Sequence, residues 1–552
     1  MRYAGEKKFN MWTVVTLILL AFFFIFVIYP VAMLLIRSFY AGGSLDLSYF
    51  GKFFSRKFYW STLVNSFKVT IISTIISTLI AVPMAYILRG IKIKGSKMLN
   101  ILIVMSYLSP PFIGAYAWIQ LLGRNGLFTN IINKLFHIKF MGLYGFAGIV
   151  LVFSLQSFPL IYMYVSGALK NLDNSLNEAA EMLGCNSVQR VTKIIFPLVM
   201  PSLLAGVLMV FMRVFSDFGT PMTIGEGYKT FPSMLYTQFM GEVSTNEGFA
   251  ASLCVIVIVI ALMLFFIQKA LGAHFSYSMT ALKPMEAMEA KGGKKIAAYI
   301  FTYFVTFLAA LPQITVIVTS FIKTISGSLF TGEFTLENYV NIIAKSNTAA
   351  ITNTYLYGLV AIVIVVVLGI LISYLSVRKK NILTNILDTL TMFPYIVPGS
   401  VLGIAFLYAF NGPPFFWGGT ALIMIISLSI RRMPYTIRSS TAIIGQISPS
   451  IEEASISLGA SQLKTFLKVM VPMMLPGVLS GAIMSWITLI SELSSSVILY
   501  TSKTMTLTVA IYSEVIRSNF GNAAAYSTIL TLTSIVSLLL FFKFSGGEDI
   551  SV

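Results

Sequence analysis

A polar segment of this chain occurs twice, so the fold must hold two copies of one unit. Residues 175–206 read SLNEAAEMLGCNSVQRVTKIIFPLVMPSLLAG, and residues 450–481 read SIEEASISLGASQLKTFLKVMVPMMLPGVLSG. The two segments align without a gap at an offset of 275, about half of the 552-residue chain. Apolar segments resemble one another through composition alone, whereas polar segments do not. The match therefore indicates an internal duplication.

Apolar runs that are long enough to cross a bilayer recur along the whole chain. Hydrophobic residues make up 57% of the sequence and charged residues 11%, against roughly 25% charged residues in a soluble domain. Because a span needs about 20 apolar residues, we expect an all-α polytopic membrane protein with twelve transmembrane helices, six in each half. The expected spans are 11–36, 62–88, 99–121, 145–169, 197–219, 249–272, 297–322, 354–377, 383–411, 418–430 continuing to about 440, 471–497 and 523–544.

The distribution of Lys and Arg predicts that both termini lie in the cytoplasm. Cytoplasmic segments of membrane proteins carry an excess of basic residues. With the N-terminus inside, most of the 38 Lys and Arg fall in inner segments, among them Arg2, Lys7, Lys8, Arg431, Arg432 and Arg438. Basic loops beside a membrane account for most of the net charge of +18. The expected partner is therefore membrane lipid, with no nucleic acid.

The chain has no pattern typical of a catalytic or metal centre. Cys185 and Cys254 stand alone, without disulfide or zinc-site spacing. No HExxH, GxSxG or GKS/T pattern occurs in the sequence. We therefore expect no catalytic residue, no cofactor and no certain metal ligand in this chain. The first apolar run lacks a small-residue cleavage site, so we interpret it as a retained span rather than a signal peptide.

The duplication extends beyond the polar segment and defines the domains. Earlier in each half the offset is 288, which pairs Tyr86 with Tyr374 and Pro110 with Pro398. The first half therefore carries about 13 extra residues in an outer loop between its third and fourth spans. An even number of spans per copy makes the repeats parallel. The expected domains are a first repeat at 1–272, a cytoplasmic linker at 273–296 and a second repeat at 297–552.

Each polar copy is expected to form two helices separated by a glycine turn. The pattern Ser-x-x-Glu, at Ser175 and again at Ser450, is typical of a capping box that begins a helix. Gly184 and Gly459 permit the left-handed turn that ends this helix. The second helix is expected to stop at Phe196-Pro197 in the first copy and at the equivalent Val471-Pro472 in the second.

Two interpretations of the repeated glutamates are open. Glu178 and Glu453 are either caps alone or part of a surface that docks another protein. Docking is favoured by Ala179 and Ala454, because a cap needs no alanine beside it and small residues let a helix sit closely in a groove. Two interpretations of the polar outer loops, such as 37–61 and 324–353, are also open. The loops either dock a soluble partner or only cover the outer surface.

The repeat resembles the EAA motif of ABC importer permeases, Glu-Ala-Ala-x3-Gly-x9-Ile-x-Leu-Pro. The matching residues are Glu178, Ala179, Ala180, Gly184, Ile194, Phe196 and Pro197, then Glu453, Ala454, Ser455, Gly459, Val469, Val471 and Pro472. The resemblance implies the type I (MetI-like) permease fold and two coupling helices. It also implies two copies of an ABC ATPase subunit, which bind ATP and Mg²⁺, because this chain has no Walker A sequence. The coupling residues would be Glu178, Ala179, Ala180 and Gly184, with Glu453, Ala454, Ser455 and Gly459.

The spans that follow the two motifs each contain a carboxylate at the same position. The segments VFMRVFSDFGTP (210–221) and SWITLISELSSSVILYT (485–501) place Asp217 opposite Glu492. An ionisable residue inside a span is a functional-site hypothesis by default. The alternatives are an ion pair between Asp217 and Arg213, four residues earlier, and a Glu492 near the outer membrane edge that water satisfies.

The same two segments resemble the fused permeases of the ferric-iron importer group, of which a DFGT-like and an ELS-like sequence are typical. Fe(III) prefers oxygen ligands, and Asp217, Glu492 and Tyr500 offer them on the expected path. Arg213 instead suits a phosphate-bearing solute. The resemblance thus implies iron import across the bacterial plasma (inner) membrane. Importers of 2-aminoethylphosphonate, hexose phosphate or thiamine share the layout and remain alternatives.

The mechanism implied by this resemblance is alternating access driven by ATP, with an extracytoplasmic binding protein that docks on the outer loops. The competing class is a twelve-span secondary transporter, whose halves are also parallel repeats. The repeated polar element between the fourth and fifth spans argues against it. A membrane-embedded transferase is disfavoured because no His/Asp or Ser/His constellation is present.

Overall fold

The computed structural model describes residues 11–41, 44–109, 111–170, 172–241, 247–274, 287–324, 332–344 and 348–544. The basic N-terminal residues and residues 275–286 of the expected linker at 273–296 lie outside these ranges. In a bilayer each backbone N–H and C=O must find its partner within the protein, which favours helices wherever the chain is apolar. The regular secondary structure of the described chain is accordingly helical, apart from one short hairpin and two isolated bridges.

The first half begins with a broken N-terminal span and ends with a long helix. Its elements are α1 (Met11–Phe23), the π-helical turn η1 (Phe24–Ile28), α2 (Tyr29–Phe39), β1 (Tyr40–Ala41), β2 (Ser44–Leu45), α3 (Ser48–Ser55), α4 (Lys57–Gly90), α5 (Ser96–Leu108), α6 (Pro111–Leu122), α7 (Leu127–Phe136), α8 (Gly145–Lys170), α9 (Asn174–Met182), α10 (Ser187–Arg190), η2 (Val191–Ile195), α11 (Phe196–Ser216), α12 (Gly219–Ile224), α13 (Phe231–Met240) and α14 (Glu247–His274). The two strands pair antiparallel, with Tyr40 opposite Leu45.

The second half repeats this order, without counterparts of η1, the hairpin β1–β2 and α7 among its described residues. It comprises α15 (Gly292–Ser320), α16 (Glu337–Ala344), α17 (Thr348–Arg378), α18 (Ile382–Ile396), α19 (Gly399–Phe410), α20 (Ala421–Gln446), α21 (Pro449–Ser457), α22 (Gln462–Thr465), η3 (Phe466–Met470), α23 (Val471–Ile490), α24 (Ser496–Leu499), α25 (Leu507–Ile516) and α26 (Phe520–Phe544). Even the prolines inside α8 and α20, Pro159 and Pro434, keep the offset of 275.

Most of the expected spans appear as long apolar helices. Within the described residues, nine helices are long and apolar enough to cross a membrane, or up to eleven if each of two bent pairs counts as one span. The bent pairs are α5–α6 and α18–α19, with angles of 103° and 110°. The second break falls at Val397-Pro398, where proline disfavours a helical conformation for the preceding residue. The expected spans 99–121 and 383–411 are therefore broken helices.

The expected tenth span corresponds to α20, which is not among the nine apolar helices. It carries Arg431 and Arg432 near its middle and Arg438 in its second half. The prediction that all three arginines follow the span is wrong, because the helix continues unbroken past them to Gln446.

The two halves exchange their first spans. The helices α1 and α2 of the first half pack against α18 and α19 of the second, and α15 of the second half packs against α5 and α6 of the first. Within each half, α4 packs on α8 and α8 on α11, as α17 packs on α20 and α20 on α23. The bent pairs thus lie where the two halves meet.

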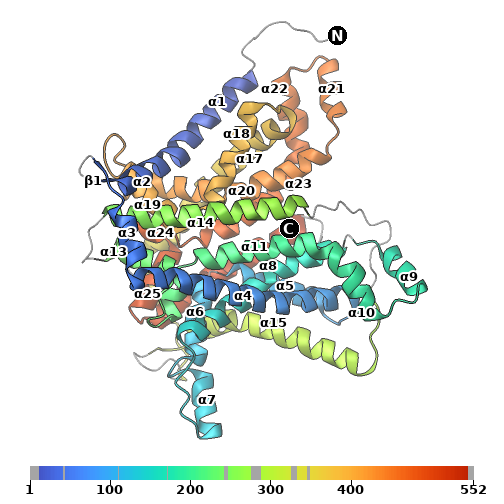
Figure 1. Ribbon diagram of the computed structural model, residues 1–552, viewed down its shortest axis with the longest axis vertical. Helices are drawn as coiled ribbons and strands as arrows, with labels where there is room; N and C mark the ends of the chain where they lie inside the picture. The colour runs from blue at the N-terminus through green and yellow to red at the C-terminus, as the bar shows by residue number, and fades with distance from the viewer. Residues whose placement is uncertain are drawn as a thin grey trace.

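Figure 1 shows how the elements divide between the two ends of the bundle. The short helices α9 and α21 lie on the right of the view, and β1, α3 and α13 lie on the left. The extra residues of the first half form α7, which projects from the body at the bottom. The insertion that the change of offset predicts is therefore a separate helix.

Candidate functional site

A cavity of about 200 Å³ lies between the two halves. Both bent pairs contribute to its wall, together with the ends of α11 and α23 and the middle of α20. Its main polar and aromatic lining residues are Tyr107, Ser109, Phe112, Arg213, Ser216, Asp217, Tyr395, Arg431, Arg432, Tyr435, Thr488, Ser491 and Glu492. Three of the four expected path residues, Arg213, Asp217 and Glu492, are therefore brought together.

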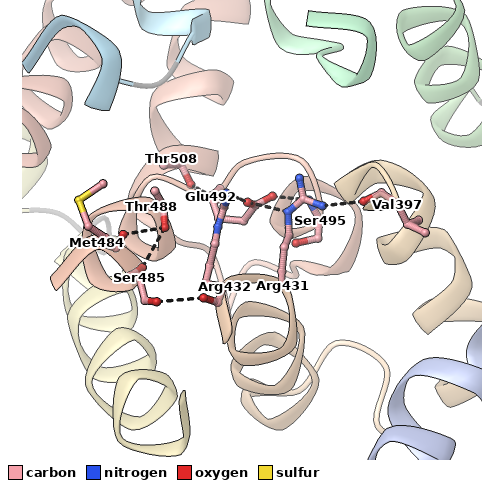
Figure 2. A network of polar contacts seen from close by, with 9 residues as sticks. All are labelled: Val397, Arg431, Arg432, Met484, Ser485, Thr488, Glu492, Ser495 and Thr508. Atoms are coloured by element: carbon pink, nitrogen blue, oxygen red, sulfur yellow. Dashed lines mark hydrogen bonds and ion pairs between the residues drawn. The ribbon is translucent and has the colours of Figure 1, made fainter. Parts of the chain in front are cut away.

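Glu492 is held by two arginines of the neighbouring helix α20, as Figure 2 shows. The Nε of Arg431 donates to a Glu492 carboxylate oxygen at 2.9 Å, and Arg432 donates to the same oxygen. The backbone N–H of Ser495 donates to the other oxygen at 3.2 Å. Only 1% of the Glu492 side chain is exposed. The alternative of a carboxylate at the membrane edge satisfied by water is therefore wrong.

The backbone leaves room for this cluster at one glycine. A Cβ placed on Gly399, the first residue of α19, would lie 2.6 Å from the guanidinium carbon of Arg431. Arg431 also donates to the Val397 carbonyl at 3.2 Å, at the break between α18 and α19. The guanidinium thus connects α20 to the bent pair as well as to Glu492.

Asp217 occupies the equivalent position in the first half but has different partners. Its carboxylate accepts the backbone N–H of Thr220 at 2.8 Å, which mirrors the contact between Glu492 and Ser495. Each carboxylate therefore accepts the N–H three residues further on, beside a short helix. Among the described residues Asp217 forms no ion pair within 4.0 Å, so the alternative of an ion pair with Arg213 is wrong.

Arg213 is instead fixed by an aromatic residue of α5. Its Nη2 donates to the Tyr107 carbonyl at 3.2 Å, and its guanidinium carbon lies 4.1 Å from the centre of the Tyr107 ring. An aromatic face attracts a guanidinium. Arg213 is therefore held at the cavity wall of the first half by a carbonyl and an aromatic face.

Tyr500, the fourth expected path residue, does not line the cavity. It follows α24, and its N–H donates to the Ser496 carbonyl at 3.0 Å. The phenol groups that do line the cavity belong to Tyr107, Tyr395 and Tyr435.

Arg431 and Arg432 are the cavity-lining residues that the sequence analysis places elsewhere. They were expected in a cytoplasmic segment, and the structure puts them in the cavity wall. A signal was available, because the offset of 275 maps them onto Gln156 and Ser157 in the middle of the fourth span.

The cavity carries more positive than negative charge. Its wall holds Arg213, Arg431 and Arg432 against Asp217 and Glu492. One carboxylate is already shared by two guanidinium groups. The described residues contain no group of three His, Cys, Asp or Glu side chains that could hold a metal ion.

The helices α9 and α21 begin two residues earlier than expected. The caps are Asp173, which accepts the N–H of Ser175 at 3.0 Å, and Ser448, which accepts the N–H of Ser450 at 3.4 Å. The capping boxes predicted at Ser175 and Ser450 are therefore wrong. An Asp or Ser two positions before an amide can accept its N–H and so takes the N-cap role.

The glycine turns are confirmed in both copies. Gly184 has φ +81° and Gly459 has φ +87°. The N–H of Cys185 bonds to the Ala180 carbonyl and that of Gly184 to the Glu181 carbonyl, and the second copy repeats both bonds. This is a Schellman motif, in which glycine adopts the left-handed conformation without strain.

Apolar side chains at these turns are left open to solvent. Met182 and Leu183 are 89% and 84% exposed, and Leu458 is 89% exposed. Ala179 and Ala454 are also exposed, whereas Ala180 is buried. Glu178 accepts a hydrogen bond from Asn174 at 2.9 Å, and Glu453 is exposed. Such a surface on two duplicated helices is typical of a docking site.

Each turn leads into one continuous helix that reaches the cavity. The helix from Val188 to Ser216 runs through η2, and the helix from Gln462 to Ile490 runs through η3. The expectation that the second helix stops at the proline is wrong. Proline lacks an N–H and crowds the carbonyl one turn back, and both copies place a single π-helical turn at this point.

Two segments of the chain match the family described as binding-protein-dependent transport system inner membrane component. They are residues 70–277 and residues 366–545, one in each half. Together they cover well over half of the chain. The chain belongs to this family. It is therefore an ABC importer permease, a multi-pass inner-membrane protein, and the secondary-transporter alternative is excluded.

This permease is similar over nearly its whole length to ferric transport permeases. The ferric transport system permease protein FbpB of Actinobacillus pleuropneumoniae is 29% identical, over 98% of this chain and 79% of its own. The Fe(3+)-transport system permease protein FbpB 2 of Haemophilus influenzae is 23% identical, over 84% and 85%. The molybdenum transport system permease protein ModB of Escherichia coli (strain K12) is 28% identical over 38% of this chain and 92% of its own.

Proposed function

We propose that this permease forms the translocation path of an ATP-driven importer that carries ferric iron, handed over by an extracytoplasmic binding protein. The observation that carries the proposal is the continuous helix in each half that joins an exposed coupling turn to the cavity between the halves. The similarity to ferric transport permeases over nearly the full chain supports iron as the cargo.

In this proposal α9 and α21 are the two sites at which ATPase subunits dock. Met182, Leu183 and Leu458 enter grooves of the ATPases, which removes their apolar surface from water. ATP binding draws the ATPases together and moves α11 and α23. The ends of these helices carry Asp217 and Glu492, so the cavity wall moves with them. The chain itself performs no covalent chemistry, and ATP and Mg²⁺ stay in the partner subunits.

The orientation follows from the same assignment. If α9 and α21 face the ATPases, that end of the bundle is cytoplasmic. Both termini then lie in the cytoplasm, in agreement with the basic residues of the inner segments. The opposite end, with α3 and α13, receives the binding protein.

A second candidate cargo is a phosphate- or phosphonate-bearing solute. It is favoured by the three arginines of the cavity wall, since guanidinium groups bind phosphate oxygens bidentately.

The test is iron uptake into proteoliposomes that contain the permease with its ATPase, loaded binding protein outside and ATP inside. We expect uptake that needs ATP, and loss of uptake in the double variant Leu183→Asp, Leu458→Asp together with loss of ATPase co-purification. The matched control is Leu135→Asp on α7, an apolar residue that is 69% exposed at a distance from the coupling turns. No ATP-dependent iron uptake by the wild-type complex would refute iron as the cargo.

A further inference from the structure

We propose that the cavity accepts its cargo as an oxyanion, so that ferric iron crosses as a complex coated with phosphate or carboxylate oxygens and carrying net negative charge. This proposal rests on the proposed function, and it assigns the chemical class that the path recognises. The observations behind it are the charge of the wall, its unpaired donors and its volume.

The guanidinium groups of the cavity come from both halves. Arg213 lies at the end of α11 in the first half, and Arg431 and Arg432 lie on α20 in the second. The internal repeat does not by itself place these arginines in the wall, since the first half has Gln156 and Ser157 at the positions equivalent to Arg431 and Arg432. An anion in the cavity would therefore have cationic groups of both halves in the lining around it.

The carboxylates of the wall are poorly placed to coordinate a metal ion. Glu492 accepts hydrogen bonds from Arg431, Arg432 and the Ser495 N–H. Asp217 accepts the Thr220 N–H. A bare trivalent cation would meet a wall with three guanidiniums and two carboxylates that already have donors. An oxyanion coat reverses the sign of the cargo and removes this repulsion.

Three donors of wall residues have no acceptor in the described part of the chain. They are the Nε of Arg432 and the hydroxyls of Ser109 and Ser491, all of which are buried atoms. A buried donor without an acceptor is costly. Phosphate or carboxylate oxygens in the cavity would supply acceptors to these three side chains, whereas a hydrated cation presents only water hydrogens.

The volume fits a small complex. A water molecule takes up about 30 Å³ in the liquid, so 200 Å³ holds about six waters. One metal ion with phosphate or a small carboxylate chelate is of comparable size. Fe(III) prefers oxygen ligands, and in this proposal it keeps both its oxidation state and its oxygen ligands throughout the passage.

The first experiment measures two labels in the same proteoliposomes, radioactive iron and radioactive phosphate, with citrate as a second oxyanion. We expect iron to enter together with the oxyanion, and to enter at least tenfold more slowly in Arg213→Gln. Arg213→Lys, which keeps the charge, should recover part of the rate. The control is Arg438→Gln, which removes an arginine of α20 that pairs with Asp388 and does not line the cavity.

Iron that enters without labelled oxyanion, at a rate unchanged in Arg213→Gln, would overturn the oxyanion proposal and leave the proposed function standing. Oxyanion that enters without iron would overturn iron as the cargo and keep the oxyanion site.

A binding measurement covers the case in which neither label enters. Phosphate or citrate should raise the Tm of the purified wild-type complex relative to chloride at equal ionic strength, but not that of Arg213→Gln. Equal Tm values in all three salts would refute the site.

Discussion

The Glu492 carboxylate is held by two guanidinium groups inside the bundle, and this pairing limits what the residue can do. Moving a charge out of water costs several kcal/mol per ion, which a well-placed partner offsets. Asp217, at the equivalent position of the first half, has one backbone donor at 2.8 Å and remains partly exposed. One repeated position therefore has two different environments.

Neutralising these two carboxylates should have unequal effects on stability. Glu492→Gln leaves Arg431 and Arg432 without their carboxylate, and breaking a buried pair in this way costs about 3–5 kcal/mol. Asp217→Asn weakens a single hydrogen bond and should cost about 1 kcal/mol. Thermal unfolding of the two purified variants in one detergent checks this, with Asp217→Asn as the matched control. Equal shifts in Tm would contradict the pairing.

The repeat located Asp217 and Glu492 from sequence, because both occupy one register position. The sequence did not predict Arg431 and Arg432 in the cavity wall, because two adjacent arginines after an apolar run are typical of a span that has ended. Their position in the cavity wall depends on Glu492, which lies 60 residues after Arg432. A contact between residues so far apart in the sequence cannot be predicted from the local composition.

Among the helices, α21 is fastened to the bundle by a cluster of charges. Glu452 accepts hydrogen bonds from Tyr374 at 2.5 Å and Lys379 at 3.2 Å, and Arg378 lies 3.8 Å away. Arg378 also donates to the carbonyls of Ile444 and Ile447 at the end of α20. The first half has Asn177 and Gly90 at the positions of Glu452 and Arg378, so its coupling helix lacks these two charges.

Removing this anchor should loosen α21 and leave α9 unchanged. Glu452→Gln breaks a mostly buried ion pair, which costs about 3 kcal/mol and should raise amide exchange in α21 about a hundredfold through local opening. Hydrogen exchange of the isolated permease measures this. Glu453→Gln, a change at the exposed neighbour, is the control. The same exchange rate in both variants would argue against the anchor.

In the proposed function the glycine turns shape the surface that docks the ATPases, so a side chain there should uncouple transport. No other atom lies within 4 Å of a Cβ added at Gly184 or Gly459, so the effect of Gly→Val is backbone strain alone. We expect both variants to insert normally and to lose iron uptake and stimulated ATP hydrolysis together. Gly445→Val, also in open space but without a positive φ, should retain both activities. Normal uptake by Gly184→Val and Gly459→Val would show that the turn does not shape the docking surface.

The helices themselves were predictable, whereas their bends were not. Apolar length and the repeat predict the order of the spans and both glycine turns. Prolines inside apolar runs produce the π-helical turns η2 and η3 and the two bent pairs. A helix either breaks at such a proline or continues through it with a local distortion. Pro398 breaks a span and Pro434 does not, although both stand in apolar surroundings. Tertiary packing decides between them.

Across the whole molecule, the exchange of first spans makes the cavity a joint product of both halves. α1 and α2 support the bent pair of the second half, and α15 supports that of the first. A displacement of either coupling helix therefore reaches a wall to which both halves contribute. This arrangement suits a path that opens alternately to the two sides of the membrane.

Cys185 reports which side carries the coupling turns. It follows Gly184 and is partly exposed, whereas Cys254 is buried. A membrane-impermeant thiol reagent should label Cys185 in inside-out vesicles that lack the ATPase and should not label it in intact cells. Labelling from outside would reverse the proposed orientation and with it the assignment of α9 and α21.

The most direct test of the account is the accessibility of the cavity in different nucleotide states. Ser216 lines the cavity and is partly exposed, so we introduce Ser216→Cys into a permease whose Cys185 and Cys254 are serine. Ser495→Cys, at a fully buried residue, is the unreactive control. An impermeant thiol reagent should reach the cysteine at position 216 from one side of the membrane without nucleotide and from the opposite side when ATP is bound but not hydrolysed. Labelling that is the same in both states would contradict a path between the halves that the coupling helices control.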